Sequence, residues 1–440
     1  MKKTYIIVIA LFFLLLALPL LAFNWEENVV SEIDNRRLTA SPLTADSLSE
    51  GMQQTQNYVS DRIGFRSDMI RLYTQAHDRL FGEMVHPSYQ YGKDGYVFFK
   101  GNGSRNSMGD FDYAFLDTIE EIYHYCDERN VPFLFLFDPS KQSVYYEQLH
   151  PGIRYRNGWV EQFTSLLEER GIPYIDNTEV LREQAAKGVE VFNRQYDAGH
   201  YNDLGAYYGT NAALTELQKQ LPSVHVNEIN EFLLSTSTVT TLPVSEFPIS
   251  EEVPQLTPKA ALTYLSNEYQ ELAIHSSFPI HNHYAQASRL AEGAPKALVF
   301  QGSYYNGYGW KFFANSFGEY HSVHDYQNVL NFSYYYQLFQ PDCVIFEVAE
   351  YTFSTNYFDY ETMLSFDLAP LPEKVTPIKA QVRMNQGEQI TTLTVTADTE
   401  AAYLYLRDGD KLYDLTRGEN NTWTLSLMNR DLPKQFDIVA

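Results

Sequence analysis

The chain has 440 residues, of which 44% are hydrophobic, so it can bury a sizeable core and is too long for one ordinary domain. Its net charge is −24, from 32 Lys and Arg against 56 Asp and Glu. This acidic balance argues against nucleic acid as a partner, because no basic excess is present to replace phosphate counterions. It also disfavours broad adhesion to an anionic membrane surface.

An apolar run near the N-terminus, from Tyr5 to Trp25, is long enough to span a bilayer, which takes about 20 residues. Two lysines precede the run and two glutamates follow it, which places the N-terminus inside and the rest outside. A cleavable signal peptide is the alternative, but Phe23 is bulky where cleavage favours a small residue. We therefore expect residues 1–25 to anchor an extracytoplasmic protein in the cell membrane, or the protein to be secreted if this segment is cleaved.

Residues 26–107 form the next predicted segment, a lead-in of helices and one β-hairpin. Apolar residues recur at helical spacing over 51–82. The stretch YQYGKDGYVFF, residues 89–99, places Lys-Asp-Gly between two aromatic runs. This pattern predicts a β-hairpin whose turn requires glycine.

From about residue 108, strands and helices alternate along the chain. Residues 131–138, VPFLFLFD, form a continuous apolar run, which is typical of a strand buried on both faces of a parallel sheet. A helix is expected before this strand, over 111–128. The elements expected after it are a helix over 158–170, a strand over 172–177, and helices over 178–187 and 202–220. Alternation at this spacing predicts an α/β fold with a parallel sheet.

An insertion at about 222–295 interrupts this alternation. It is rich in Ser, Thr, Pro and Glu, which predicts irregular or short β structure. The α/β pattern then resumes, so the domain is expected to span 108–370. Its remaining elements are strands over 296–303, 321–325 and 342–350 and helices over 309–317 and 327–339.

Residues 375–440 have a different pattern, with short alternating segments at regular spacing. These segments are AQVRM, TTLTVTA, AAYLYLR, TWTLSLM and FDIVA. They predict a small β-sandwich-like module of about 65 residues. Carbohydrate binding and a structural capping role are both open for it.

The cysteines and histidines suggest neither a disulfide framework nor a metal. Cys126 and Cys343 are the two cysteines, and we predict two separate buried thiols, although an exported protein can pair them. The nearest approach to a metal motif is His281-Asn282-His283, and an isolated pair of this kind is weak evidence. We therefore predict no metal and no cofactor.

Two segments carry residues suited to acyl transfer. Ser303 follows Gly302 directly after a buried strand, where reacting groups of open α/β sheets gather. A serine in a strand-to-helix turn has an exposed hydroxyl and a backbone N–H near a developing oxyanion. Asp197 and His200 lie on one short turn before a helix, and a His oriented by an Asp can take a proton from Ser. The alternatives are a helix N-cap for Asp197 and an ordinary polar contact for His200.

Six motifs occur in order between about residues 31 and 351: SEIDNRRL, YVSDRIGFR, YGKDGYVFF, FDPSKQSVYYEQLHPG, YDAGHYNDLGAYYG and FQGSYYN. This set resembles the SGNH-hydrolase-like family of the alginate O-acetyltransferases AlgJ and AlgX, and most of all its Gram-positive DHHW branch. The resemblance implies an SGNH-like parallel sheet flanked by helices. It also implies Ser303 as the nucleophile, His200 as the general base and Asp197 as its orienting partner.

Two motifs depart from the family pattern. The family's D-x-H-W is D-A-G-H-Y here, one residue longer and with the spacing of ordinary SGNH esterases. Its G-D-S is Q-G-S here, so the acid that normally shapes the nucleophile turn is missing. Loss of both standard motifs is compatible with a non-catalytic member.

Four further residues are candidates for binding substrate. Lys141 stands at the family's P-x-K position, where it would bind substrate or an anion unless it is an ordinary surface lysine. Tyr304, Tyr305 and Asn306 follow the nucleophile and would contact a sugar or donate to the oxyanion. Packing is an equal alternative for both tyrosines.

The resemblance implies a function and a set of partners. It predicts an extracytoplasmic O-acyltransferase that acetylates a cell-surface or secreted polysaccharide through a Ser acyl-enzyme, with an MBOAT-type membrane acyltransferase as the partner that supplies acetyl groups. One alternative is a carbohydrate esterase with the same three residues. Another is a non-catalytic member that binds glycan or scaffolds a polysaccharide assembly complex.

Overall fold

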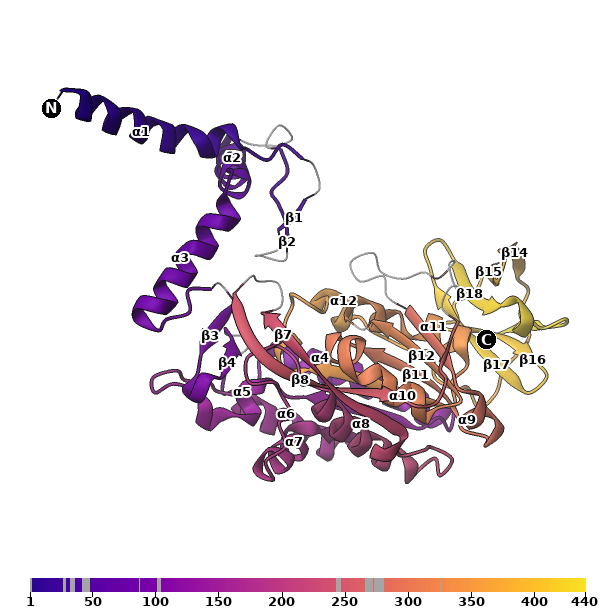
Figure 1. Ribbon diagram of the computed structural model, residues 1–440. Helices are drawn as coiled ribbons and strands as arrows, with labels where there is room; N and C mark the ends of the chain where they lie inside the picture. Colours follow the sequence, from indigo (N-terminus) through magenta and orange to yellow (C-terminus); the bar gives the residue numbers. More distant parts are fainter. Residues whose placement is uncertain are drawn as a thin grey trace. The chain divides into compact units, whose positions relative to one another are not determined.

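The computed structural model describes residues 2–26, 29–31, 36–41, 48–86, 88–100, 104–242, 247–265, 272, 281–324 and 326–440. The chain divides into two compact units, which are both present in Figure 1. The first comprises Met1–Lys100, Asn193–Ala198 and Ser237–Val253. The second comprises Gly101–Phe192, Gly199–Thr236 and Pro254–Ala440.

Three helices begin the first unit: α1 (Lys2–Leu21), α2 (Leu48–Arg62) and α3 (Arg66–Phe81). Within the described residues, one helix is long and apolar enough to cross a membrane, and its span Thr4–Leu21 has a mean hydropathy of 2.8. Signal sequences share this length and composition. The end of α1 is held near the turn that follows α2, where Gly64 N–H donates to the carbonyl of Pro19 at 2.9 Å. A Cβ at Gly64 would lie 2.4 Å from that of Ala22, so only glycine fits this approach.

The predicted hairpin is present in the first unit. Strands β3 (Tyr89–Tyr91) and β4 (Val97–Phe99) pair in antiparallel register. Asp94 and Gly95 between them both have positive φ angles, 52° and 77°, which is why the turn requires glycine. The short strands β1 (Val30–Ser31) and β2 (Arg36–Arg37) also pair with each other.

The predicted insertion contains β structure, but two of its strands have 10 and 11 residues and are not short. Its strands are β7 (Phe232–Thr241), β8 (Pro248–Pro258), β9 (Thr263–Tyr264) and β10 (His281–Ala285), followed by helix α9 (Ala287–Ala291). β7 and β8 form a two-stranded sheet. Residues 243–246, 266–271 and 273–280 of the predicted insertion lie outside the described residues.

A seven-stranded sheet with the order β6-β5-β13-β11-β12-β10-β9 forms the centre of the second unit. The strands β5 (Phe133–Asp138), β6 (Tyr174–Asp176), β11 (Lys296–Gln301), β12 (Glu319–His324) and β13 (Cys343–Ala349) are parallel, as predicted. β10 then pairs antiparallel with β12, and β9 with β10. The insertion therefore extends the sheet, which its polar sequence did not indicate.

Helices cover both faces of this sheet (Figure 1). Alternate side chains of β5 enter two different cores. Phe133, Phe135 and Phe137 enter one core, and Leu134 and Leu136 enter the other. The phenylalanine core is formed with α4 (Asp110–Glu128), α6 (Gly158–Glu169) and α11 (Phe332–Phe339). The leucine core is formed with α7 (Asn177–Ala186), α8 (Asp203–Gln218) and α10 (Trp310–Ser316). Burial on both faces is why the strand is apolar throughout.

Both cysteines are free and buried, as predicted. Cys126 lies on α4 and Cys343 begins β13. Two shorter helices, α5 (Lys141–Val144) and α12 (Tyr360–Leu364), complete the α/β part.

The C-terminal residues form one antiparallel sheet of six strands with its own core. Its order is β14-β15-β18-β17-β16-β19, with bounds Gln381–Gln386, Ile390–Thr396, Thr422–Met428, Lys411–Arg417, Leu404–Asp408 and Asp437–Val439. Strand β17 was not predicted, because buried Asp414 breaks its apolar alternation. Asp414 accepts a hydrogen bond from the Tyr125 hydroxyl of α4 at 2.5 Å and one from the Gln337 amide of α11.

Candidate active site

The carboxyl ends of three parallel strands meet at one edge of the large sheet. β5 ends at Asp138, β11 at Gln301 and β13 at Ala349, and these strands are neighbours in the order β5-β13-β11. Reacting groups of open α/β sheets gather at such an edge. Ser303, the predicted nucleophile, lies two residues after the end of β11.

Ser303 begins a helical stretch that continues to the end of α10. Residues 303–304 are helical, Tyr305–Gly309 form a π-helical turn, and α10 follows. The carbonyl of Gly302 accepts a hydrogen bond from the N–H of Asn306 at 3.1 Å, which closes the first turn. The first N–H groups of a helix have no partner within the helix and point towards its positive end. The turn therefore presents a hydroxyl together with backbone donors.

The side chains of Ser303 and His200 meet. His200 Nε2 lies 2.8 Å from Ser303 Oγ, and the Tyr351 hydroxyl lies 2.6 Å from the same Oγ. All three side chains are half-buried, so the Ser303 hydroxyl is accessible. If neutral His200 accepts the serine proton, the Tyr351 O–H must be the donor to Oγ, since a hydroxyl has one proton.

His200 is held just before α8 by a capped turn. Asn202 is the N-cap of α8, and its side-chain oxygen accepts hydrogen bonds from the N–H groups of Leu204 and Gly205 at 3.0 and 3.1 Å. Its side-chain amide donates to the carbonyl of Glu190 at 2.7 Å. The N-cap alternative for Asp197 is therefore wrong for this helix, because Asn202 has that role.

Asp197 belongs to the first compact unit, whereas His200 belongs to the second. Its φ of 47° lies in the left-handed region, which Asp adopts more readily than most residues. The role of Asp197 as the orienting acid remains a prediction.

A buried acid from the neighbouring strand holds the nucleophile turn. Glu347 of β13 accepts a hydrogen bond from the Gly302 N–H at 2.6 Å and is fully buried. Glu347 thus contacts the turn whose usual acid is missing from the Q-G-S motif. Sequence reasoning missed it because it lies 45 residues further along the chain. The available signal was a lone acid within the apolar strand CVIFEVA.

Glu347 is paired with a second buried carboxyl. Asp138, at the end of β5, lies beside Glu347 and accepts a hydrogen bond from the Asn177 amide at 2.7 Å. Burial raises the pKa of Asp138 to about 7. Because burial disfavours the charged form, Asp138 lies beside Glu347 in the apolar interior at lower cost when it is protonated.

Glu350 fixes the neighbouring loop. Its carboxylate accepts hydrogen bonds from the Ser140 N–H at 2.8 Å, the Ser143 hydroxyl at 2.6 Å and the Tyr155 hydroxyl at 2.8 Å. Burial raises the pKa of Glu350. Tyr351 is the next residue in the chain, so this anchor also places the phenol that contacts Ser303.

The four predicted substrate-binding residues have different surroundings. Lys141 begins α5 and is fully buried, so it is not a surface lysine. Tyr304 and Tyr305 are also fully buried, and their hydroxyls contact the Pro139 carbonyl at 2.9 Å and the Thr210 hydroxyl at 3.0 Å. Asn306 is half-buried and accepts from the Gln301 amide at 2.7 Å. Both tyrosines therefore pack the nucleophile helix onto its neighbours in this structure.

Residues 90–258 match the family model described as the SGNH hydrolase-like domain of acetyltransferase AlgX. The resemblance to this family is confirmed. The matched residues include Asp197 and His200 but end before Ser303. The SGNH-like α/β fold predicted from the motifs is likewise confirmed. No curated protein sequence matches this chain.

Several solved structures are similar to the chain at low identity. PatB1 of Bacillus cereus is 14% identical with a TM-score of 0.47, covering 61% of this chain and 98% of its own. The O-acetyltransferase domain of Pseudomonas putida AlgJ is 16% identical with a TM-score of 0.43, and the match covers 64% of this chain and 99% of the AlgJ domain. A DHHW family protein from Eubacterium siraeum is 15% identical with a TM-score of 0.44, and the match covers 64% of this chain and 96% of that protein's chain. Nothing about chemistry follows from similarity at this level.

Proposed function

We propose that this protein is an extracytoplasmic O-acyltransferase that acetylates a cell-surface or secreted polysaccharide through a Ser303 acyl-enzyme. The observation that carries the proposal is the 2.8 Å contact between Ser303 Oγ and His200 Nε2 at a strand-to-helix turn. The match of residues 90–258 to a domain described as that of an acetyltransferase supports acetyl transfer as the reaction. The apolar helix α1 supports an extracytoplasmic position on a membrane anchor.

The reaction has two halves with one base. In the first, Ser303 Oγ attacks the carbonyl carbon of an acetyl donor while His200 takes the serine proton. The tetrahedral intermediate collapses, the donor's leaving group departs with that proton, and an acetyl ester remains on Ser303. In the second, a sugar hydroxyl attacks this ester as His200 takes its proton. The sugar ester leaves, and the proton returns to Ser303.

Groups around the turn suit the charge that develops on the carbonyl oxygen. The N–H of Ser303 lies at the start of a helical stretch, where backbone donors and the helix dipole favour an anion. The hydroxyl of Tyr351, 2.6 Å from Oγ, is freed as a donor when Oγ becomes bonded to carbon. We assign Tyr351 the role of stabilising the oxyanion beside the backbone donors.

The remaining roles are part of the same proposal. Asp197 orients His200, and Asn306 and Lys141 bind the substrate. The loop that carries Lys141 accepts a hydrogen bond from Tyr304, the residue after the nucleophile, which supports a place for Lys141 near the site. An MBOAT-type membrane acyltransferase supplies the acetyl groups.

The test uses the full-length chain in detergent with an activated acetyl ester, followed by intact-mass spectrometry. We expect an acetyl adduct in the wild type that is absent from Ser303→Ala and retained in Ser365→Ala, a control at an exposed serine. His200→Gln is expected to slow the adduct by at least about 100-fold, the usual contribution of a general base. We expect a loss of similar size for Asp197→Asn if this Asp orients the base.

A second step separates the two enzyme alternatives. Acetylated protein is mixed with an acetyl-free polysaccharide, and sugar ester and free acetate are both measured. Ester formation supports the transferase, whereas rapid acetate release without an ester supports the esterase that uses the same residues. A folded wild type that gives neither adduct nor turnover, even in membranes with a co-expressed MBOAT-type protein, would contradict both and favour the non-catalytic scaffold.

A further inference from the structure

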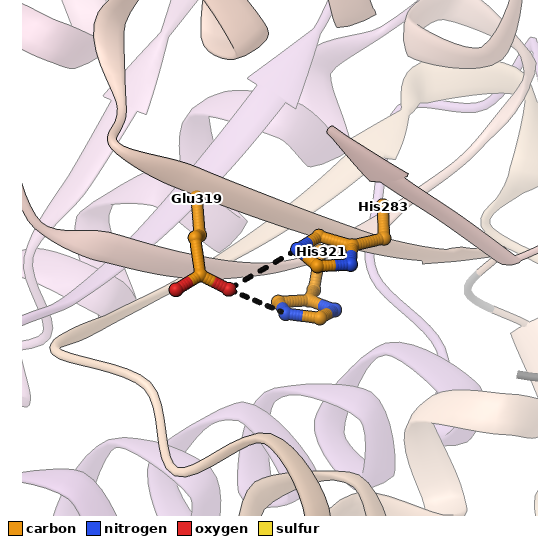
Figure 2. A group of neighbouring side chains, drawn as sticks. All are labelled: His283, Glu319 and His321. Atoms are coloured by element: carbon orange, nitrogen blue, oxygen red, sulfur yellow. Dashed lines mark hydrogen bonds and ion pairs between the residues drawn. The ribbon is translucent and has the colours of Figure 1, made fainter. Parts of the chain in front are cut away.

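Two histidines and a glutamate converge at the opposite end of the large sheet (Figure 2). His283 of β10 lies directly opposite His321 of β12 in the antiparallel pair. Glu319 precedes His321 by two residues, so its side chain points to the same face of the sheet. The sequence motif around His283 was dismissed as an isolated pair, because the strand that completes the cluster is nearly 40 residues away.

The ligand atoms have separations close to those of a zinc site. Glu319 Oε2 lies 3.1 Å from His283 Nε2 and 3.7 Å from His321 Nε2, and all three side chains offer a ligand atom within 4.8 Å of the others. Tetrahedral zinc with bonds of about 2.0–2.2 Å keeps neighbouring ligand atoms about 3.4 Å apart. Two of the separations are therefore within about 0.3 Å of that value. The two imidazole planes are stacked 14° apart, so the rings must rotate out of this stack for both nitrogens to face one ion.

The surroundings favour a closed site with one opening. The His283 and His321 side chains are 3% and 2% exposed, whereas that of Glu319 is 28% exposed. The His321 ring is stacked between His283, at 3.9 Å between ring centroids, and Phe339 of α11, at 4.2 Å. Solvent therefore reaches the cluster from the glutamate side, where a water molecule can complete four-coordination.

One cation lies on the neighbouring strand. Lys296 pairs with Glu319 across β11 and β12, but its ammonium group donates to the carbonyl of Phe339 at 3.2 Å. The Glu319 carboxylate instead contacts the two imidazoles in Figure 2. Neutral imidazoles and a carboxylate form a donor set that zinc accepts readily.

We propose that His283, His321 and Glu319 bind one Zn²⁺ ion that fastens the antiparallel strand β10 to β12. The ion replaces the hydrogen bond between Glu319 and His283 and the longer contact between Glu319 and His321. It joins the strand contributed by the insertion to the parallel part of the sheet, at the edge where, among the described residues, the other neighbour of β10 is the two-residue strand β9.

The role of this ion is structural. Glu319 pairs with the first residue of β11, whereas Ser303 follows the last one by two residues. At about 3.3 Å per residue, the two sites are roughly 20 Å apart along the strand. The histidine site also faces the side of α11, whereas the nucleophile helix α10 lies on the other face. The proposal is therefore independent of the acyl-transfer chemistry.

The test begins with the full-length chain in detergent after treatment with a chelator. Zinc binding is measured by competition with a chromogenic indicator and by metal analysis after gel filtration. Co²⁺ is used as a second probe, because its visible spectrum distinguishes four-coordinate from six-coordinate sites. The variants are Glu319→Gln, which keeps the size and polarity of the side chain, and His283→Phe, which keeps the stacking on His321.

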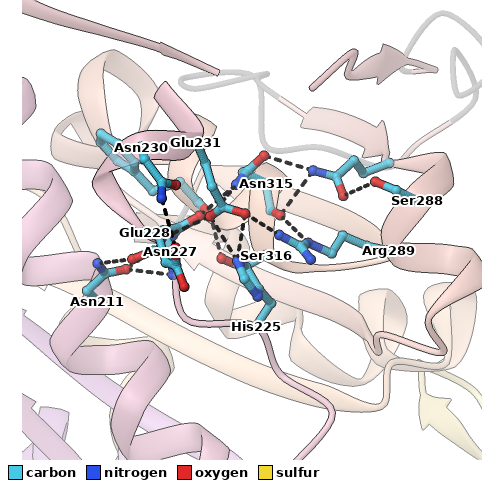
Figure 3. A network of polar contacts seen from close by, with 12 residues as sticks. Asn211, His225, Asn227, Glu228, Asn230, Glu231, Ser288, Arg289, Asn315 and Ser316 are labelled. Atoms are coloured by element: carbon cyan, nitrogen blue, oxygen red, sulfur yellow. Dashed lines mark hydrogen bonds and ion pairs between the residues drawn. The ribbon is translucent and has the colours of Figure 1, made fainter. Parts of the chain in front are cut away.

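A matched control is available in the same unit. His225 Nε2 contacts the Glu231 carboxylate at 2.8 Å, and Arg289 completes this network in Figure 3. This histidine–glutamate pair has a cation in place of the second imidazole, so His225→Gln should not change zinc binding.

We expect one zinc per wild-type chain and a four-coordinate cobalt spectrum. Glu319→Gln and His283→Phe should each weaken zinc affinity by more than about 100-fold, because loss of an outer-shell partner alone costs about 10–100-fold. The proposal is overturned if the wild type retains less than a tenth of an equivalent under equimolar zinc, or if either variant still binds a full equivalent. The wild-type titration and cobalt spectrum decide the matter if a variant does not fold.

Discussion

Replacing Glu347 should loosen the turn that carries Ser303. The Gly302 N–H donates to the Glu347 carboxylate at 2.6 Å in a fully buried environment. Glu347→Gln keeps an acceptor oxygen, and Glu347→Leu removes the acceptor. Both changes act on the position of Ser303 and leave the side chains of Ser303 and His200 unchanged.

The magnitude follows from the type of hydrogen bond. A hydrogen bond contributes about 1 kcal/mol, and Glu347→Gln retains an acceptor oxygen, so this variant should lower the free energy of unfolding by about 1 kcal/mol or less. Glu347→Leu leaves the Gly302 N–H unsatisfied and should cost about 1–3 kcal/mol. A displacement of Ser303 by about 1 Å can reduce its rate by about 100-fold. We therefore expect acylation to fall about 10-fold in the first variant and about 100-fold in the second.

The assay combines the rate of acetyl-adduct formation with urea unfolding of the full-length chain. Asp342→Asn is the matched control, because Asp342 accepts a hydrogen bond from the Lys296 N–H at 2.8 Å. It therefore bridges the same two strands at their other end. This control should lose some stability but retain the wild-type acylation rate.

One result would refute the reasoning. If folded Glu347→Leu acylates as fast as the wild type, the Glu347 contact does not position the nucleophile. A rate loss of the same size in Asp342→Asn would mean that general loosening of the strand pair, and not the turn, sets the rate.

Three further predictions concern other contacts of the second unit. Tyr351→Phe should slow acylation about 100-fold, as loss of one oxyanion donor does, with little change in the urea midpoint. Burial raises the pKa of Asp138 to about 7, above its usual value of 3.8, so its favourable contribution is complete below pH 3.8 and is lost as pH rises to 7. The free energy of unfolding is therefore measured against pH for the wild type and for Asp138→Asn. Relative to the variant, the wild-type value should fall by a few kcal/mol between about pH 4 and pH 7 and change little above. Equal slopes of the two curves would contradict this. Asp414→Leu leaves the Tyr125 hydroxyl and Gln337 amide without their acceptor and should cost about 2–4 kcal/mol in urea unfolding, with an unchanged midpoint as the contrary outcome.

Much of the α/β architecture could be predicted because it rests on local patterns. The run at 133–138 is apolar because both faces of its strand are buried, and the hairpin at 89–99 is marked by the glycine its turn requires. Strand β17 was not predicted, because no local pattern marks it. Buried Asp414 is tolerated there by partners on two distant helices, and no local pattern shows them.

In the candidate site, too, some residues are marked by the local sequence and others are not. Ser303 and His200 could be named as candidates from the sequence, because a strand end and a turn before a helix mark both positions locally, and their catalytic roles remain predictions. The partners Tyr351 and Glu347 were not found, since they are brought to Ser303 by the order β5-β13-β11, in which β13, the latest of the three in the sequence, lies between the other two.

The sequence by itself determined the apolar N-terminal helix, the alternation of strands and helices, and the residue types suited to acyl transfer. Only the tertiary structure decided which acid holds the Q-G-S turn and which histidines face Glu319 across two strands. The physical reason is that periodicity and turn chemistry act over a few residues. A contact between strands depends instead on sheet order and register, which the packing of the whole domain selects.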